Sequence, residues 1–125
     1  MTSLPGIRSQ HRALSLGVVL AVLALPLFGC SGGDPEVAVV MTEFSFDPRP
    51  VPVQAGRRTF ITLENRGTTE HNFTVPQLNV ASANIPAGGK GRVEIAAPPG
   101  GYRLLCTIEG HEAAGMVAEV RVARR

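Results

Sequence analysis

The sequence predicts an all-β domain, a β-sandwich or a small barrel, for residues 36–125. From Glu36 onward no segment keeps an apolar period of 3.6 residues over ten residues, so no amphipathic helix is expected. Short runs of alternating polarity, rich in Val, Ile, Phe and Thr, follow one another instead. The chain contains 14 Gly and 10 Pro, and many of them separate these runs. Short strands joined by frequent turns are typical of sandwiches and barrels.

The first two strands are expected near the start of this domain. Val37, Val39 and Met41 share one face of a strand, and Phe44 and Phe46 share one face of the next. The parity of the apolar residues changes at 42–43, which indicates a bulge or a break there.

Five further strands follow in order. The first covers residues 58–64 and ends in a turn at 65–67, and the others cover 71–75, 92–97, 102–106 and 116–122. Seven prolines are expected between strands, where a missing amide donor does little harm. They are Pro48, Pro50, Pro52, Pro76, Pro86, Pro98 and Pro99.

Residues 1–29 are expected to be a signal peptide. Residues 1–12 contain Arg8 and Arg12 and no acid, and residues 13–28 carry no charge. A basic leader before a short apolar run is typical of a secretory signal, and this run is shorter than the roughly 20 residues of a membrane-spanning helix. The two arginines are not adjacent, so the twin-arginine signature is missing. We therefore expect export of the unfolded chain, with any cofactor acquired outside the cytoplasm.

The end of this leader resembles a bacterial lipobox, Leu27-Phe28-Gly29-Cys30. The resemblance implies that Cys30 is lipidated and becomes the first residue of the mature protein. The alternatives are a signal that is cleaved and leaves a cysteine, and an uncleaved anchor. Residues 30–35 are expected to form a short tether. The protein is then expected on the extracytoplasmic face of the cell membrane or in the periplasm.

Charge and composition exclude several classes of protein. Of the twelve Lys and Arg, Arg8 and Arg12 lie in the leader, which leaves ten basic residues against ten acidic ones in the mature chain. A nucleic-acid-binding protein would need a basic surface that this balance does not supply. An apolar fraction of 44% is too high for a disordered chain. Two Cys can form neither a multiple-disulfide scaffold nor a four-thiolate zinc site.

The mature chain holds few side chains that bind soft or borderline metal ions, and three of them lie in one segment. Cys106, His111 and Met116 have the spacing Cys-x4-His-x4-Met between the last two expected strands. Gly110 and Gly115 give this loop the backbone freedom to fold back on itself. His71 lies in an earlier strand.

Strand parity indicates that these side chains converge. Cys106 shares a strand face with Leu104, and His71 shares one with Phe73. Met116 likewise lies on the apolar face of its strand, whereas His111 lies in the loop, where it can reach inward and keep one edge near solvent. Each residue taken alone would be interpreted as part of the core, but free thiols are avoided in oxidising compartments. All four together therefore predict a metal site.

The donor set favours copper. Two imidazoles, one thiolate and a weak thioether suit an ion that alternates between Cu(I) and Cu(II). A structural zinc site would want a stronger fourth ligand than Met116, and a catalytic metal would need an open position. Multicopper oxidases need more than two histidines. We therefore expect a protein that is not an enzyme, and copper storage or delivery is the alternative to electron transfer.

These motifs resemble those of the cupredoxins, the plastocyanin, azurin and rusticyanin group of type 1 blue copper proteins. The loop Gly110-His111-Glu112-Ala113-Ala114-Gly115-Met116 is similar to the rusticyanin and sulfocyanin variety, and the resemblance includes residues 43–48 and 70–73. It implies a Greek-key arrangement of about seven to eight strands and one copper per chain. It also implies that Asn72 ties the two ligand loops together and that electrons pass through the edge of His111.

Three acidic residues lie close to the expected ligands in sequence: Glu70, Glu109 and Glu112. They predict an acidic docking face for a basic redox partner, such as a cytochrome c or a membrane oxidoreductase. Ordinary solvated carboxylates are the alternative. We expect a monomer with no nucleic-acid partner and with contact to the membrane through a lipid anchor.

Overall fold

The computed structural model describes residues 1–3 and 32–124, so the expected signal peptide and Cys30 lie outside the described residues. The described residues 32–124 belong to one compact unit. Its strands are β1 (Glu36–Thr42), β2 (Ser45–Asp47), β3 (Val51–Gln54), β4 (Thr59–Asn65), β5 (Thr74–Val75), β6 (Val80–Ala81), β7 (Lys90–Ile95), β8 (Gly100–Leu105) and β9 (Val117–Ala123). A single 3-10 turn, η1 (Pro76–Leu78), separates β5 from β6. The prediction of an all-β domain is confirmed.

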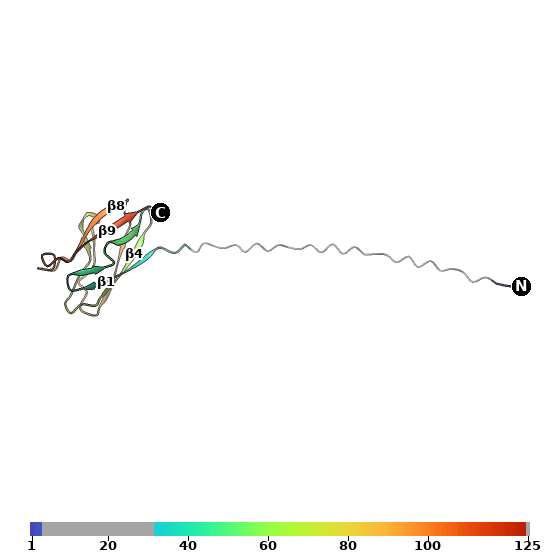
Figure 1. Ribbon diagram of the computed structural model, residues 1–125, viewed down its shortest axis with the longest axis horizontal. Helices are drawn as coiled ribbons and strands as arrows, with labels where there is room; N and C mark the ends of the chain where they lie inside the picture. Colours follow the sequence, from blue (N-terminus) through green and yellow to red (C-terminus); the bar gives the residue numbers. More distant parts are fainter. Residues whose placement is uncertain (4–31, 125) are drawn as a thin grey trace. The chain divides into compact units, whose positions relative to one another are not determined.

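The strands form two mixed sheets (Figure 1). One has the order β2-β1-β4-β7 and the other the order β3-β9-β8-β5-β6. Alternate side chains of each sheet, such as Ile61 and Leu63 of β4 and Val120 and Val122 of β9, are buried in one common core. Among the described residues no helix has the length and apolarity to cross a membrane.

The strand registers define two ends of this sandwich. β1 and β4 run parallel, from the pair Glu36–Phe60 to the pair Met41–Asn65. We call these the Glu36 end and the Asn65 end. The turn at 55–58 joins β3 to β4 at the Glu36 end, and the pair Gln54–Ala123 places the end of β9 there as well. Since β9 runs antiparallel to β8, the 106–116 loop that joins them lies at the Asn65 end.

Two details of the expected strands are wrong. Phe44 does not share a strand face with Phe46, because it lies in the turn between β1 and β2 with φ of 59° and an exposed ring. Pro52 does not lie between strands but inside β3. It is tolerated there because β3 is an edge strand. On the open side of an edge strand there is no neighbouring strand, so a missing amide donor costs no hydrogen bond between strands.

The strand expected at 71–75 is shorter than predicted. His71 forms an isolated bridge with Ile85, and regular pairing begins only at Thr74. Between His71 and Thr74, the side chain of Asn72 makes hydrogen bonds that are not part of the strand pairing. The predicted break at 42–43 is close to the observed turn at 43–44.

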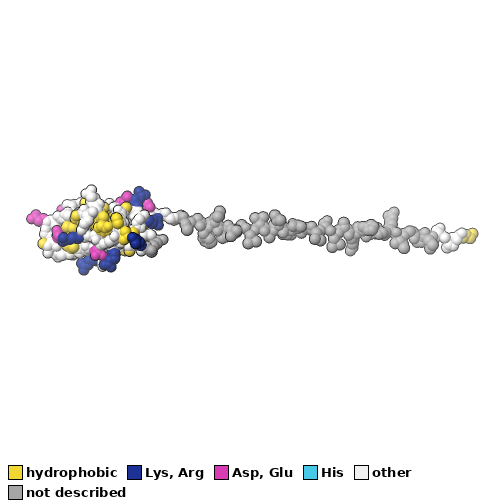
Figure 2. All heavy atoms as spheres, turned by 90° about the horizontal axis from the view of Figure 1, so that it is seen from above, with side chains coloured by type: hydrophobic (Ala, Val, Ile, Leu, Met, Phe, Trp, Pro, Cys, Tyr) yellow, Lys and Arg dark blue, Asp and Glu magenta, His cyan; other side chains and the backbone are white. Residues whose placement is uncertain are grey.

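Charged side chains of both signs are interspersed over the face seen in Figure 2, with apolar side chains between them. This mixture agrees with the equal numbers of basic and acidic residues after residue 29.

Candidate metal centre

The loop at 106–116 is closed by its own backbone hydrogen bonds. The amide of Met116 donates to the carbonyl of His111 at 3.0 Å, and the amide of Cys106 donates to the carbonyl of Met116 at 3.2 Å. Gly110 and Gly115 have φ of 82° and 99°, which side chains with a Cβ rarely adopt. These bonds bring Cys106, His111 and Met116 together at the Asn65 end.

Three of the expected ligands meet at one point. Their donor atoms, from His71, Cys106 and His111, lie within 4.8 Å of one another. The two imidazole Nδ1 atoms are 3.2 Å apart, and Nδ1 of His111 is 3.5 Å from Sγ of Cys106. Met116 is fully buried beside them in the core, and its ligand role stays a prediction.

This arrangement fits a single transition-metal ion. Donor atoms bonded to one ion at about 2.0–2.3 Å lie roughly 3.3–3.7 Å apart, close to the spacing observed here. The set of two imidazoles and one thiolate is one that copper uses. His71, Cys106 and Met116 would hold the ion from the core, and the half-buried His111 would hold it from a largely exposed loop.

Burial keeps His71 in the form that binds metals. Its imidazole is fully buried, which lowers its pKa, and the nearby His111 lowers the pKa further, whereas Glu43 raises it. The ring is therefore neutral at neutral pH, with a lone pair available for a metal ion.

Asn72 joins the strand of His71 to the loop of Cys106. Its side-chain oxygen accepts from the amide of Thr107 at 2.9 Å, and its nitrogen donates to Oγ1 of Thr107 and to Oδ1 of Asn84, each at 2.9 Å. Its backbone amide donates to Sγ of Cys106 at 3.4 Å. Such contacts orient metal ligands and hold negative charge on a thiolate.

Asn65 supports the site and was expected only as a turn residue. Its buried amide group donates to the carbonyls of Thr69 at 2.7 Å and Ile85 at 2.8 Å, and accepts from the amide of Gly67 at 2.9 Å. A Cβ at Gly67 would lie only 2.9 Å from Nε2 of His71, so the loop packs tightly on this imidazole. The Asn-x-Gly pattern indicates a turn, but nothing in it indicates a buried amide.

The turn between β1 and β2 supports both imidazoles. The carboxylate of Glu43 accepts hydrogen bonds from the amide and from Oγ1 of Thr68, in the loop that packs on His71. The ring of Phe44 lies edge-on to His111, with centroids 5.4 Å apart and an interplanar angle of 88°. The change of parity at 42–43 could have indicated this turn, although not its contacts.

Replacing Glu43 with Gln is expected to change how stability depends on pH. The hydrogen bond from the Thr68 amide is the main cause that lowers the pKa of Glu43 to about 2, from an ordinary value of 4.5. A lowered pKa means that the carboxylate stabilises the folded state above pH 4.5 and that this contribution is lost as the pH falls toward 2.

Urea unfolding of the metal-free protein at pH 7 and at pH 3 measures this effect. We expect wild type to exceed Glu43→Gln in stability at pH 7, with a smaller difference at pH 3. The control Glu36→Gln removes an exposed carboxylate at the opposite end. Equal differences at the two pH values would contradict the role assigned to Glu43.

Comparisons with known proteins agree with this geometry. A family model for the cupredoxin-like domain matches residues 13–118. No curated protein matches the chain. A solved structure of dithionite-reduced auracyanin from the photosynthetic bacterium Roseiflexus castenholzii is similar, with 22% identity and a TM-score of 0.63 over 74% of this chain and 99% of that one. Auracyanin B is also similar, with 21% identity and a TM-score of 0.61 over 71% and 88% of the two chains.

The two likenesses to solved structures, at these identities, show a shared fold. The family match extends over most of the sequence and includes His71, Cys106, His111 and Met116. The chain therefore belongs to the family of cupredoxin-like domains.

Proposed function

We propose that this protein transfers single electrons through one copper ion held by His71, Cys106, His111 and Met116. The observation that carries the proposal is the meeting of two imidazole nitrogens and one thiol sulfur within 4.8 Å in a cupredoxin-like domain. When bound, copper supplies a centre that gains or loses one electron.

The surrounding residues favour an electron carrier over a copper-delivery protein. Cys106 and His71 have no exposed surface, and the hydrogen bonds of Asn72 and Asn65 fix the loops that carry them. A site held in this way changes little between oxidation states and exchanges its metal slowly. Only the edge of His111 approaches solvent, beside the exposed ring of Phe44.

A redox titration of the copper-loaded protein tests this function. We expect a reversible transition that follows a one-electron curve, with no loss of metal to a chelator over many cycles. Loss of copper on each reduction would instead support storage or delivery.

Replacing Met116 with Leu is expected to shift the midpoint potential and keep copper bound. The Met116 thioether would be a weak donor to copper, and Leu has a similar volume in this fully buried position. The measurement is the same redox titration, with the bound metal determined in parallel. An unchanged potential would mean that Met116 only packs the core.

We further propose that the mature protein is exported and tethered to the membrane through a lipid on Cys30. The lipobox resemblance of residues 27–30 supports this location. Cys30→Ala is expected to move the protein from the membrane fraction to the soluble fraction, because the thiol that accepts the lipid is removed. Ser31→Ala is the control and should stay with the membrane. A Cys30→Ala protein that still sediments with membranes after signal cleavage would contradict the anchor.

We also propose that the partner is a basic redox protein, such as a cytochrome c. Glu70 and Glu109 are exposed near the ligands, whereas Glu112 is paired with Arg103 at 2.5 Å. The first two are therefore the carboxylates left for a partner. Electron transfer to a basic partner should slow as ionic strength rises, since salt screens attraction between surfaces. A rate that does not fall with salt would exclude this docking face.

A further inference from the structure

The first contacts of the chain with the domain lie far from the candidate metal centre. We infer that the fold fixes the membrane attachment at the Glu36 end, that Gly33–Pro35 hold it there, and that the edge of His111 therefore faces the aqueous phase. This inference rests on the proposed anchoring through Cys30.

Strand geometry separates the two ends. β1 begins next to Pro35, pairs with Phe60 of β4 at Glu36, and pairs with Asn65 at Met41. Seven residues of strand span about 20 Å. The side chain of Asn65 binds the carbonyl of Ile85, which in turn accepts from the amide of His71. The attachment and the metal ligands thus lie at opposite ends of the same strands.

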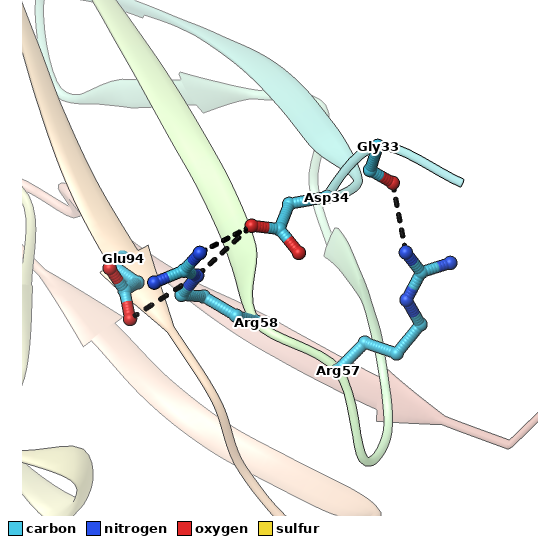
Figure 3. A network of polar contacts seen from close by, with 5 residues as sticks. All are labelled: Gly33, Asp34, Arg57, Arg58 and Glu94. Atoms are coloured by element: carbon cyan, nitrogen blue, oxygen red, sulfur yellow. Dashed lines mark hydrogen bonds and ion pairs between the residues drawn. The ribbon is translucent and has the colours of Figure 1, made fainter. Parts of the chain in front are cut away.

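Three consecutive residues fasten the chain at the Glu36 end, and Figure 3 shows the contacts of the first two, Gly33 and Asp34. Arg58 donates to Oδ2 of Asp34 from Nη2 at 2.6 Å and from Nε at 3.1 Å, and it lies 4.0 Å from Glu94 on its other side. Arg57 donates to the carbonyl of Gly33 at 2.8 Å. The carbonyl of Pro35 accepts from the amide of Phe60 at 2.9 Å. An exposed ion pair alone contributes little to stability. Here it acts together with the hydrogen bonds that the backbone carbonyls of Gly33 and Pro35 accept.

These contacts shorten the expected tether. Of residues 30–35, Gly33, Asp34 and Pro35 contact the domain, so only two residues lie between Cys30 and Gly33. A chain of this length reaches about 10 Å when fully extended. The Glu36 end is therefore held close to the lipid, and the Asn65 end is free to point away from it.

Charge at the Asn65 end acts in the same direction. Its acidic residues are Glu43, Asp47, Glu64, Glu70, Glu109 and Glu112, and its basic residues are Arg66, Lys90 and Arg103. Anionic phospholipid headgroups repel this excess of carboxylates. A partner protein then meets the edge of His111 from the aqueous side.

Two labels on either side of β7 test the orientation. Ala87 is exposed next to Gly88, whose amide donates to the carbonyl of Asn65, and Ala96 is exposed just after Ile95, which pairs with Thr59. Ala87→Cys and Ala96→Cys would be labelled with a fluorophore in the full chain, loaded with copper and purified from membranes. Cys106 is fully buried, so the unsubstituted chain controls for stray labelling.

The labelled chains would be placed in vesicles of phosphatidylcholine and phosphatidylglycerol with nitroxide-labelled headgroups. We expect several-fold stronger quenching at position 96 than at position 87. Asp34→Ala should reduce this difference, and Glu36→Ala, its neighbouring control, should not. If Asp34→Ala changes the difference in quenching no more than Glu36→Ala does, the ion pair of Asp34 with Arg58 does not hold the orientation.

The remaining outcomes separate this inference from the function on which it rests. Equal quenching at the two positions, or stronger quenching at 87, in a chain that stays bound would overturn the orientation alone. A chain that washes off the vesicles would overturn the anchor and the orientation with it. The visible absorption of the same samples reports on the copper centre independently.

Discussion

Replacing Cys106 with Ser is expected to abolish the intense visible absorption of the copper-loaded protein. That absorption requires a thiolate bonded to copper, and a Ser hydroxyl is a hard, protonated donor at neutral pH. Cys106 is fully buried, with Nδ1 of His111 at 3.5 Å and the Asn72 amide at 3.4 Å from its sulfur. Ser preserves much of this packing, so the fold should survive while the band disappears.

The matched control is Cys30→Ser, which removes the other cysteine of the chain. Absorption spectra of the two variants, taken at equal copper and protein concentrations, make the comparison. Cys30→Ser should keep the full band of wild type. A band that persists in Cys106→Ser would show that copper is bound elsewhere.

Replacing Asn72 with Ala is expected to give a large loss of stability. It removes three side-chain hydrogen bonds of 2.9 Å and leaves the amide of Thr107 without its partner. Losing these hydrogen bonds at a buried position lowers the free energy of unfolding by about 2–3 kcal/mol, and the unpaired amide of Thr107 lowers it further. For a domain of this size we expect thermal unfolding to begin on the order of 10 °C lower.

Asn84→Ala is the matched control, because it removes a single partner of Asn72 from an exposed position. Its cost should be about 1 kcal/mol or less. Thermal unfolding of the metal-free proteins separates the two effects from any effect on copper. Equal losses for both variants would mean that Asn72 does not tie the loops together.

Much of the fold could be predicted because alternation of apolar residues is a local signal. Parity alone predicts that Val39 and Met41 of β1 share one face, and both are buried in the core. The family resemblance identified the loop at 106–116 as the one that carries three of the expected copper ligands. The spacing of Cys106, His111 and Met116 was informative because so few other soft donors are present.

Part of the support around the site could not be predicted from the residues, because it depends on contacts distant in sequence. The family resemblance implied the role of Asn72, which binds Thr107 across 35 residues, but nothing indicated that Asn65 binds a carbonyl 20 residues away. The left-handed conformation of Phe44 is unusual for a bulky residue, so parity assigned it to a strand. The contacts of Gly33 and Asp34 with Arg57 and Arg58 likewise span 24 residues, and composition alone indicated a free tether.

The central claim is that His71, Cys106, His111 and Met116 hold one copper ion for electron transfer, and a Cu(II) titration of the metal-free protein tests it most directly. We predict that an intense visible band grows to one equivalent of copper, disappears on addition of a reductant and returns on oxidation. A protein that stays colourless with copper, or that holds zinc in its place, would contradict the claim.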